Sequence, residues 1–128
     1  MTTRIMVADD SLFARMLAKE AVSNIFSDAE FMEAASGADA LAMAEADAYQ
    51  LDWYLLDINM GGPNGVDTAK ALIAAGVAAH KIALVTGNRS KDLQDDAEAA
   101  GLTYILKTIS PNDVDQFIER LRQFFTSP

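Results

Sequence analysis

The chain has 128 residues and no cysteine, and its formal net charge is −9 at pH 7. This length suits one domain built around one hydrophobic core, which we expect to cover residues 1–128. The lack of cysteine excludes disulfide bonds, thiolate metal ligands and cysteine nucleophiles. The strong negative charge argues against nucleic acid as a direct partner, because phosphate binding requires clustered Lys and Arg side chains.

No segment carries a targeting or membrane signal. The apolar runs are too short to span a bilayer, and the N-terminus lacks the pattern of a signal peptide. We therefore expect a cytoplasmic, monomeric protein that does not contact membranes.

The first half of the chain alternates short apolar runs with amphipathic segments. The pattern predicts strands at 5–8, 30–34 and 53–56, and helices at 11–24 and 37–46. The apolar side of the first helix is expected to contain Leu12, Phe13, Met16, Leu17 and Ala21.

The second half continues this alternation, with strands predicted at 82–85 and 104–106. Helices are predicted at 66–75 and 91–100, ending at Gly76 and Gly101. The last helix begins around Ser110-Pro111, a capping residue followed by proline. We expect one stripe of this helix to cover the sheet, formed by Val114, Phe117, Ile118, Leu121, Phe124 and Phe125.

The strand pattern predicts the fold. Four of the five predicted strands are continuously apolar, as is typical of strands buried on both faces of a parallel sheet. A helix after each strand indicates an α/β fold with helices on both faces. Right-handed crossovers then favour a flavodoxin-like, doubly wound sheet of strand order 2-1-3-4-5.

Polar residues follow four of the predicted strands. Asp9 and Asp10 come after the first, Asp57 after the third, Thr86 after the fourth and Lys107 after the fifth. Each residue alone has an ordinary explanation as a helix cap, a turn residue or a solvated side chain. Together they predict a site, because sites of parallel sheets form at the carboxyl ends of the strands.

Three carboxylates in one crevice repel each other unless a cation lies between them. Carboxylate and carbonyl oxygens suit Mg²⁺, which takes few protein carboxylates and keeps several waters. A lysine and a hydroxyl beside such an ion favour an anion with several oxygens, such as a phosphoryl group. One carboxylate can then act as the nucleophile and form an acyl phosphate.

These segments resemble a response-regulator receiver domain of two-component signalling, of the single-domain CheY-like kind. The resemblance rests on "VADDS", "LLDINMGGPNG", "LVTGN" and "YILKT" at four successive strand ends. Their order and spacing agree together, and the match covers nearly the whole chain.

The resemblance implies a role for each residue of the chemical site. Asp57 would accept the phosphoryl group. Asp10 would bind Mg²⁺ directly and Asp9 through water, with the backbone carbonyl of Asn59 as a further ligand. Lys107 would pair with the acceptor carboxylate and then with a phosphoryl oxygen.

The resemblance also implies a switch. Thr86 would bond a phosphoryl oxygen, and the ring of Tyr104 would change rotamer with it. The fourth helix, fifth strand and last helix would then change their affinity for a downstream protein. The donor would be a histidine kinase or a histidine phosphotransfer protein, so we expect a signalling switch and not an enzyme with a separate substrate. Without an output domain in the sequence, we expect output through binding another protein.

The clearest departure from the family pattern is Thr108, which follows Lys107 where proline is usual; glycines at Gly61 and Gly87 also replace commoner residues. A cis bond before a non-proline residue costs about 3 kcal/mol. This bond is therefore either trans, with a reshaped loop, or cis and strained.

Other functions fit parts of the sequence. A Mg²⁺-dependent aspartyl phosphatase would be expected to show D-x-D after the first strand, whereas Asp9 and Asp10 are adjacent. A flavin carrier would need a Ser/Thr/Gly-rich phosphate loop there. A phosphate sink without output, and a receiver-like module that is never phosphorylated, remain alternatives within the same fold.

Overall fold

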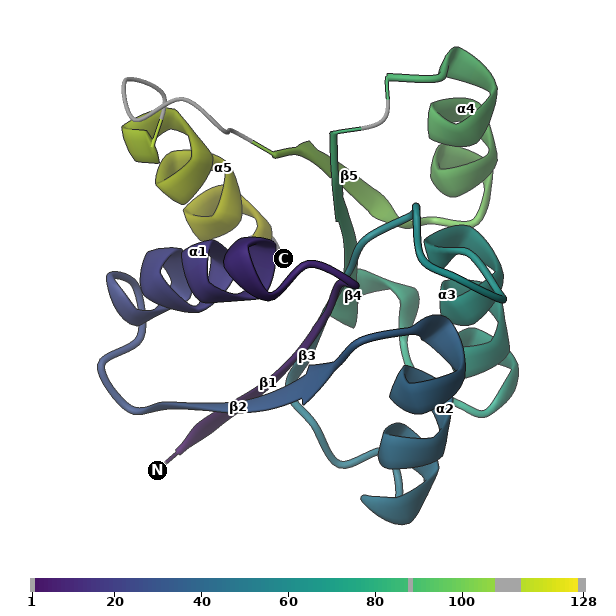
Figure 1. The fold of residues 1–128 in the computed structure, drawn as a ribbon, viewed down its shortest axis with the longest axis horizontal. Helices are drawn as coiled ribbons and strands as arrows, with labels where there is room; N and C mark the ends of the chain where they lie inside the picture. The colour runs from purple at the N-terminus through teal and green to yellow at the C-terminus, as the bar shows by residue number, and fades with distance from the viewer. Residues whose placement is uncertain (1, 88, 108–113, 127–128) are drawn as a thin grey trace.

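The computed structural model describes residues 2–87, 89–107 and 114–126 (Figure 1). The described elements alternate strand and helix along the chain, with one short 3-10 helix, η1, at Ala79–Lys81. The strands are β1 Thr3–Ala8, β2 Ala29–Ala34, β3 Trp53–Leu56, β4 Ile82–Thr86 and β5 Thr103–Leu106. The helices are α1 Leu12–Ser23, α2 Gly37–Ala46, α3 Gly65–Ala74, α4 Lys91–Ala99 and α5 Val114–Thr126.

The five strands form one parallel sheet in the order β2-β1-β3-β4-β5. Helices α1 and α5 cover one face, and α2, α3 and α4 cover the other (Figure 1). This arrangement confirms the predicted flavodoxin-like fold and strand order. None of the helices in the described part of the chain has the length and apolar character needed to cross a bilayer.

Strand β1 shows why a continuous apolar run predicts a strand that is buried on both faces of the sheet. Its last four residues are all buried, with exposures from 0 to 3%. Ile5 and Val7 join the core beneath α1 and α5, whereas Met6 and Ala8 join the core beneath α2, α3 and α4. A strand in the middle of a two-faced sheet therefore needs apolar residues at every position.

The predicted apolar side of α1 was partly wrong. Leu12, Phe13 and Met16 are 61, 66 and 54% exposed. The burial of Ala21 is confirmed, but its buried neighbours on the helix are Ala18 and Val22. Small side chains on this face allow the helix to lie close to the sheet and to α5, whereas the larger residues at the start of the helix stay exposed.

Helix ends follow the predicted capping chemistry. Gly76 and Gly101, after α3 and α4, have φ of +111° and +77°, a conformation that favours glycine and ends a helix. The sheet-facing stripe of α5 is confirmed, with Phe117, Leu121 and Phe124 buried. The predicted start of this helix at 110–111 lies outside the described residues.

Tyr54, at the centre of β3, is fully buried. Its hydroxyl has no hydrogen-bond partner among the described residues. Burial, followed by the negative charge of Asp47, raises the pKa of this hydroxyl, while the Leu51 backbone offsets the shift only in part. The neutral phenol is therefore favoured, at the cost of a poorly satisfied polar group in the core.

We expect the substitution Tyr54→Phe to stabilise the protein by roughly 1 kcal/mol, because it removes a buried hydroxyl that makes no well-formed hydrogen bond to the described residues. Urea unfolding measures this as a higher midpoint with an unchanged m-value. Tyr49→Phe, on a partly buried ring, is the matched control and should change little. A loss of stability in Tyr54→Phe alone would mean that the hydroxyl is well bonded.

Candidate functional site

The predicted site residues lie at the carboxyl edge of the sheet. Asp9 and Asp57 follow β1 and β3, which are neighbours in the sheet, and Thr86 ends β4 beside them. Lys107 follows β5, and its backbone N–H donates to the Thr86 carbonyl at 2.9 Å. The topology thus brings residues from distant parts of the chain to one place.

Asp9 is held by contacts in three directions. Asp9 is buried, with only 4% of its surface exposed. The backbone N–H donates to the Ala34 carbonyl of β2 at 3.0 Å. One carboxylate oxygen accepts from the Ser11 N–H at 2.9 Å, and the other accepts from Lys107 Nζ at 2.5 Å. Asp9 therefore links the end of β1 to the start of α1 and to the end of β5.

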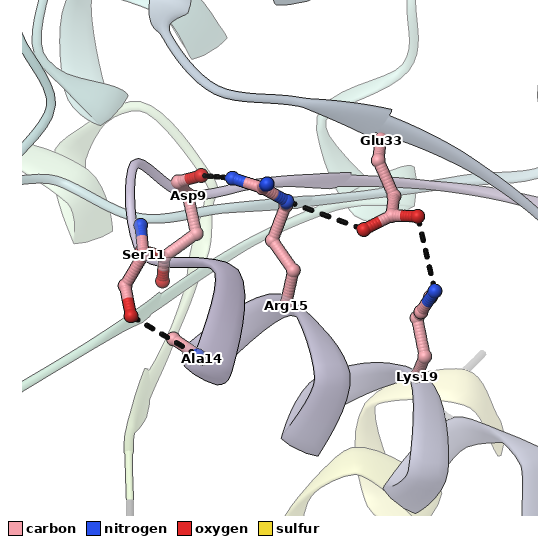
Figure 2. A network of polar contacts seen from close by, with 6 residues as sticks. All are labelled: Asp9, Ser11, Ala14, Arg15, Lys19 and Glu33. Carbon is pink, nitrogen blue, oxygen red and sulfur yellow. Dashed lines mark hydrogen bonds and ion pairs between the residues drawn. The ribbon is translucent and has the colours of Figure 1, made fainter.

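Ser11 gives α1 its N-terminal cap. Its hydroxyl oxygen accepts a hydrogen bond from the Ala14 N–H at 3.2 Å (Figure 2). The prediction that the helix starts at Ser11 is confirmed, because Ser11 is the N-cap of α1. With the cap on Ser11, the neighbouring Asp10 side chain is not needed to begin the helix and stays exposed.

Asp57 is also buried, at 5% exposure. Its N–H donates to the Ala8 carbonyl at 2.8 Å, which fixes the end of β3 against β1. The Gly65 N–H donates to the Ile58 carbonyl at 3.0 Å, so the loop after Asp57 closes onto the start of α3. The position of Asp57 therefore depends on close backbone packing.

Lys107 bridges the two buried carboxylates. Its ammonium lies 2.5 Å from an oxygen of Asp9 and 3.2 Å from an oxygen of Asp57. Burial by itself lowers the pKa of Lys107, but the hydrogen bond to Asp9 and the charge of Asp57 outweigh it, so the pKa lies above its ordinary value. The family resemblance implied pairing with the acceptor carboxylate, yet the shorter contact is to Asp9.

Carboxylate oxygens of Asp9, Asp10 and Asp57 lie within 4.8 Å of one another. Only the Asp10 side chain is exposed, so this group of three, here called the acid pocket, opens towards solvent on one side. Closely spaced carboxylate oxygens are hard ligands that suit Mg²⁺. The acid pocket is therefore compatible with Mg²⁺ binding.

An apolar cavity of about 230 Å³ adjoins the acid pocket. Its lining includes Asp9, Asp57 and Lys107 together with apolar residues such as Phe13 and Leu17. Apolar surroundings lower the local dielectric and strengthen charge interactions. The ion pairs of Lys107 are therefore stronger than pairs on an open surface would be.

The other predicted site residues differ in how deeply they are buried. Thr86 is fully buried, and Asn59 is exposed in the loop after β3. Tyr104 is partly buried on β5; burial and the charge of Asp57 raise the pKa of its hydroxyl. The charge of Asp57 therefore acts on the Tyr104 hydroxyl. The Lys107–Thr108 bond lies outside the described residues.

A charged network beside Asp9 was not predicted from the sequence. It is formed by Arg15, Lys19 and Glu33 (Figure 2). Lys19 is the main cause of a lowered pKa for the Glu33 carboxyl, with Arg15 contributing, so Glu33 stays charged. The sequence offered one signal for this network. Arg15 and Lys19 are four residues apart on one predicted helix, shortly after Asp9 and Asp10, and so lie on the same helix face.

Residues 5–119 match the family model of the response regulator receiver domain, and the chain therefore belongs to this family. It is the receiver domain of a response regulator in two-component systems. The nitrate/nitrite response regulator protein NarP of Escherichia coli (strain K12) is 32% identical over 108 residues, which is 84% of this chain and 49% of NarP. The chain spans about half the length of the curated relatives it matches.

Solved structures show the same fold at low identity. The phosphorylated cyanobacterial phytochrome response regulator RcpA has a TM-score of 0.85 at 19% identity, covering 99% of this chain and 96% of that chain. A chain of the CheX–CheY–BeF3–Mg²⁺ complex from Borrelia burgdorferi has a TM-score of 0.79 at 18% identity, covering 98% of this chain and 90% of that chain.

Proposed function

We propose that this receiver domain accepts a phosphoryl group on Asp57 in the presence of Mg²⁺ and thereby switches a protein-binding surface. The observation that carries the proposal is the acid pocket, whose three carboxylates lie within 4.8 Å of one another beside the Lys107 ammonium. Two structural relatives support this chemistry, since one is a phosphorylated regulator and the other belongs to a complex with BeF3 and Mg²⁺.

Asp10, Asp57 and the carbonyl of Asn59 are proposed to hold the ion, with Asp9 acting through water. Bound Mg²⁺ would supply positive charge to the oxygens of the transferred group. An oxygen of Asp57 would attack phosphorus while the bond from phosphorus to the donor breaks, and the donor leaves with the electron pair. The product on the protein is an acyl phosphate.

Lys107 is proposed to change partners during this step. In the structure its ammonium contacts both Asp9 and Asp57. Transfer adds negatively charged oxygens beside Asp57, which offer this ammonium a stronger charge-assisted hydrogen bond. The Thr86 hydroxyl would donate to another of these oxygens, and Tyr104 on the adjacent strand would follow.

The physiological donor is proposed to be a histidine kinase or a phosphotransfer protein, and the working unit a cytoplasmic, monomeric domain over residues 1–128. The switched surface would be formed by α4, β5 and α5, and Tyr104 lies on β5, the edge strand of the sheet. Switching would be a population shift, driven by contacts that differ between the two states.

Incubation with a small acyl phosphate tests the proposal, with intact mass as the readout. We expect the mass of one phosphoryl group to appear with Mg²⁺ and not with a chelator. Mg²⁺ alone should also raise the unfolding temperature, since it binds the folded state. No phosphoryl uptake from either an acyl phosphate or a histidine phosphotransfer protein would favour an unphosphorylated interaction module. Steady release of phosphate from phosphate esters would favour a hydrolase.

A further inference from the structure

A chain of charged contacts runs from Asp9, one member of the acid pocket, through Arg15 of α1 to Glu33 of β2 and Lys19 (Figure 2). Arg15 Nη1 donates to the backbone carbonyl of Asp9 at 2.5 Å. Arg15 Nε donates to one carboxylate oxygen of Glu33 at 3.2 Å, and Lys19 Nζ donates to the other at 3.0 Å. The Arg15 side chain is only 15% exposed, whereas its partner Glu33 is 36% exposed.

The carbonyl that Arg15 contacts belongs to the peptide that joins Asp9 to Asp10. A peptide unit is planar, so the direction of this carbonyl also sets the position of the Asp10 nitrogen and Cα. The Asp9 N–H, on the preceding peptide, already donates to Ala34 of β2. The Arg15 contact is thus made to the peptide from which the exposed Asp10 side chain begins.

Glu33 holds the guanidinium in place from the neighbouring strand. It lies on β2 opposite Val7 of β1, two residues before Asp9. A guanidinium carries several donors in a rigid plane and can contact the Asp9 carbonyl and Glu33 together. A lysine ammonium carries the same charge, but all its donors lie on one nitrogen, so it cannot reproduce this bridge.

We infer that Arg15 is a positioning residue for the metal-binding acids, with Glu33 as its support, an inference that rests on the function proposed above. Arg15 does not contact the ion. It holds the Asp9–Asp10 peptide in the orientation that places the Asp10 carboxylate beside Asp9 and Asp57. Removing a group that orients a metal ligand in this way typically weakens metal binding by 10–100-fold.

The test is calorimetric titration of the whole chain with Mg²⁺, for wild type, Arg15→Lys and Glu33→Gln. Arg15→Lys keeps the charge but loses the bridge, and we expect it to weaken Mg²⁺ binding about tenfold. Glu33→Gln keeps an oxygen that can accept from Arg15 and should have a smaller effect in the same direction. Arg122→Lys is the matched control, because Arg122 pairs with Glu119 on the exposed side of α5. It should bind Mg²⁺ like wild type.

Thermal unfolding without Mg²⁺ separates positioning from a purely structural role. If Arg15→Lys lowers the unfolding temperature but binds Mg²⁺ with wild-type affinity, the inference is wrong. It is also wrong if Arg15→Lys binds normally and only Arg15→Met binds weakly, since charge alone would then be responsible. Failure of the wild type to bind Mg²⁺ would instead overturn the proposed function, and the inference with it.

Discussion

Replacing Asp57 by Asn is expected to abolish phosphoryl uptake and to make the metal-free protein more stable. The amide of Asn has nearly the same shape as the carboxylate but does not form an acyl phosphate. Asp57 is 5% exposed and shares the Lys107 ammonium with Asp9, which makes the closer contact. Its own charge is therefore only partly compensated, and its removal should raise the free energy of unfolding by roughly 1 kcal/mol.

Intact mass after incubation with an acyl phosphate measures the first effect, and urea unfolding in a chelator measures the second. Glu20→Gln is a suitable control because it removes a negative charge from an exposed position on α1. It should keep full phosphoryl uptake. Uptake by Asp57→Asn would place the acceptor on another residue, and lower stability would mean that the Asp57–Lys107 pair is net favourable.

The substitution Gly65→Ala is expected to lower the free energy of unfolding by about 3 kcal/mol and to impair phosphorylation. A Cβ at this position would lie 2.8 Å from the carbonyl carbon of Asp57 and 2.9 Å from Cα of Ile58. These are backbone atoms, which cannot rotate away. Relief of the clash must therefore move either the start of α3 or the end of β3, where the acceptor lies.

Gly61→Ala is the matched control for this prediction. Gly61 lies in the same loop, but an added Cβ there would meet no heavy atom within 4 Å. Its effect on stability should stay within about 0.5 kcal/mol. Urea unfolding and the rate of mass gain would be compared for both variants. Equal behaviour of the two would show that the loop relaxes freely around Gly65.

The fold, and the proximity of the polar side chains that follow its strands, could be predicted from the sequence for a physical reason. A parallel sheet buried on both faces requires continuous apolar strands, and its carboxyl ends meet at one edge. Asp9, Asp57 and Lys107 follow such strands, so their proximity was predictable without knowing any side-chain orientation. Their assignment to phosphoryl transfer came from the family resemblance and stays a prediction.

Details that depend on side-chain direction were not predictable in the same way. The first helix contains large apolar residues on one side and small ones on another, and the sequence does not say which side meets the sheet. The closer approach of Lys107 to Asp9 than to Asp57 depends on the direction in which the chain leaves β5. The contact from Arg15 to a backbone carbonyl leaves no pattern in the sequence at all, because any residue has that carbonyl.

The ion pair of Lys107 with Asp9 joins residues that are 98 positions apart in the chain. Contacts between residues this far apart raise the contact order of a protein, and a high contact order slows folding. During synthesis the three aspartates emerge well before the lysine that neutralises them. A nascent chain that ends before β5 therefore carries an uncompensated cluster of negative charge, and the docking of β5 completes the site and the sheet in the same step.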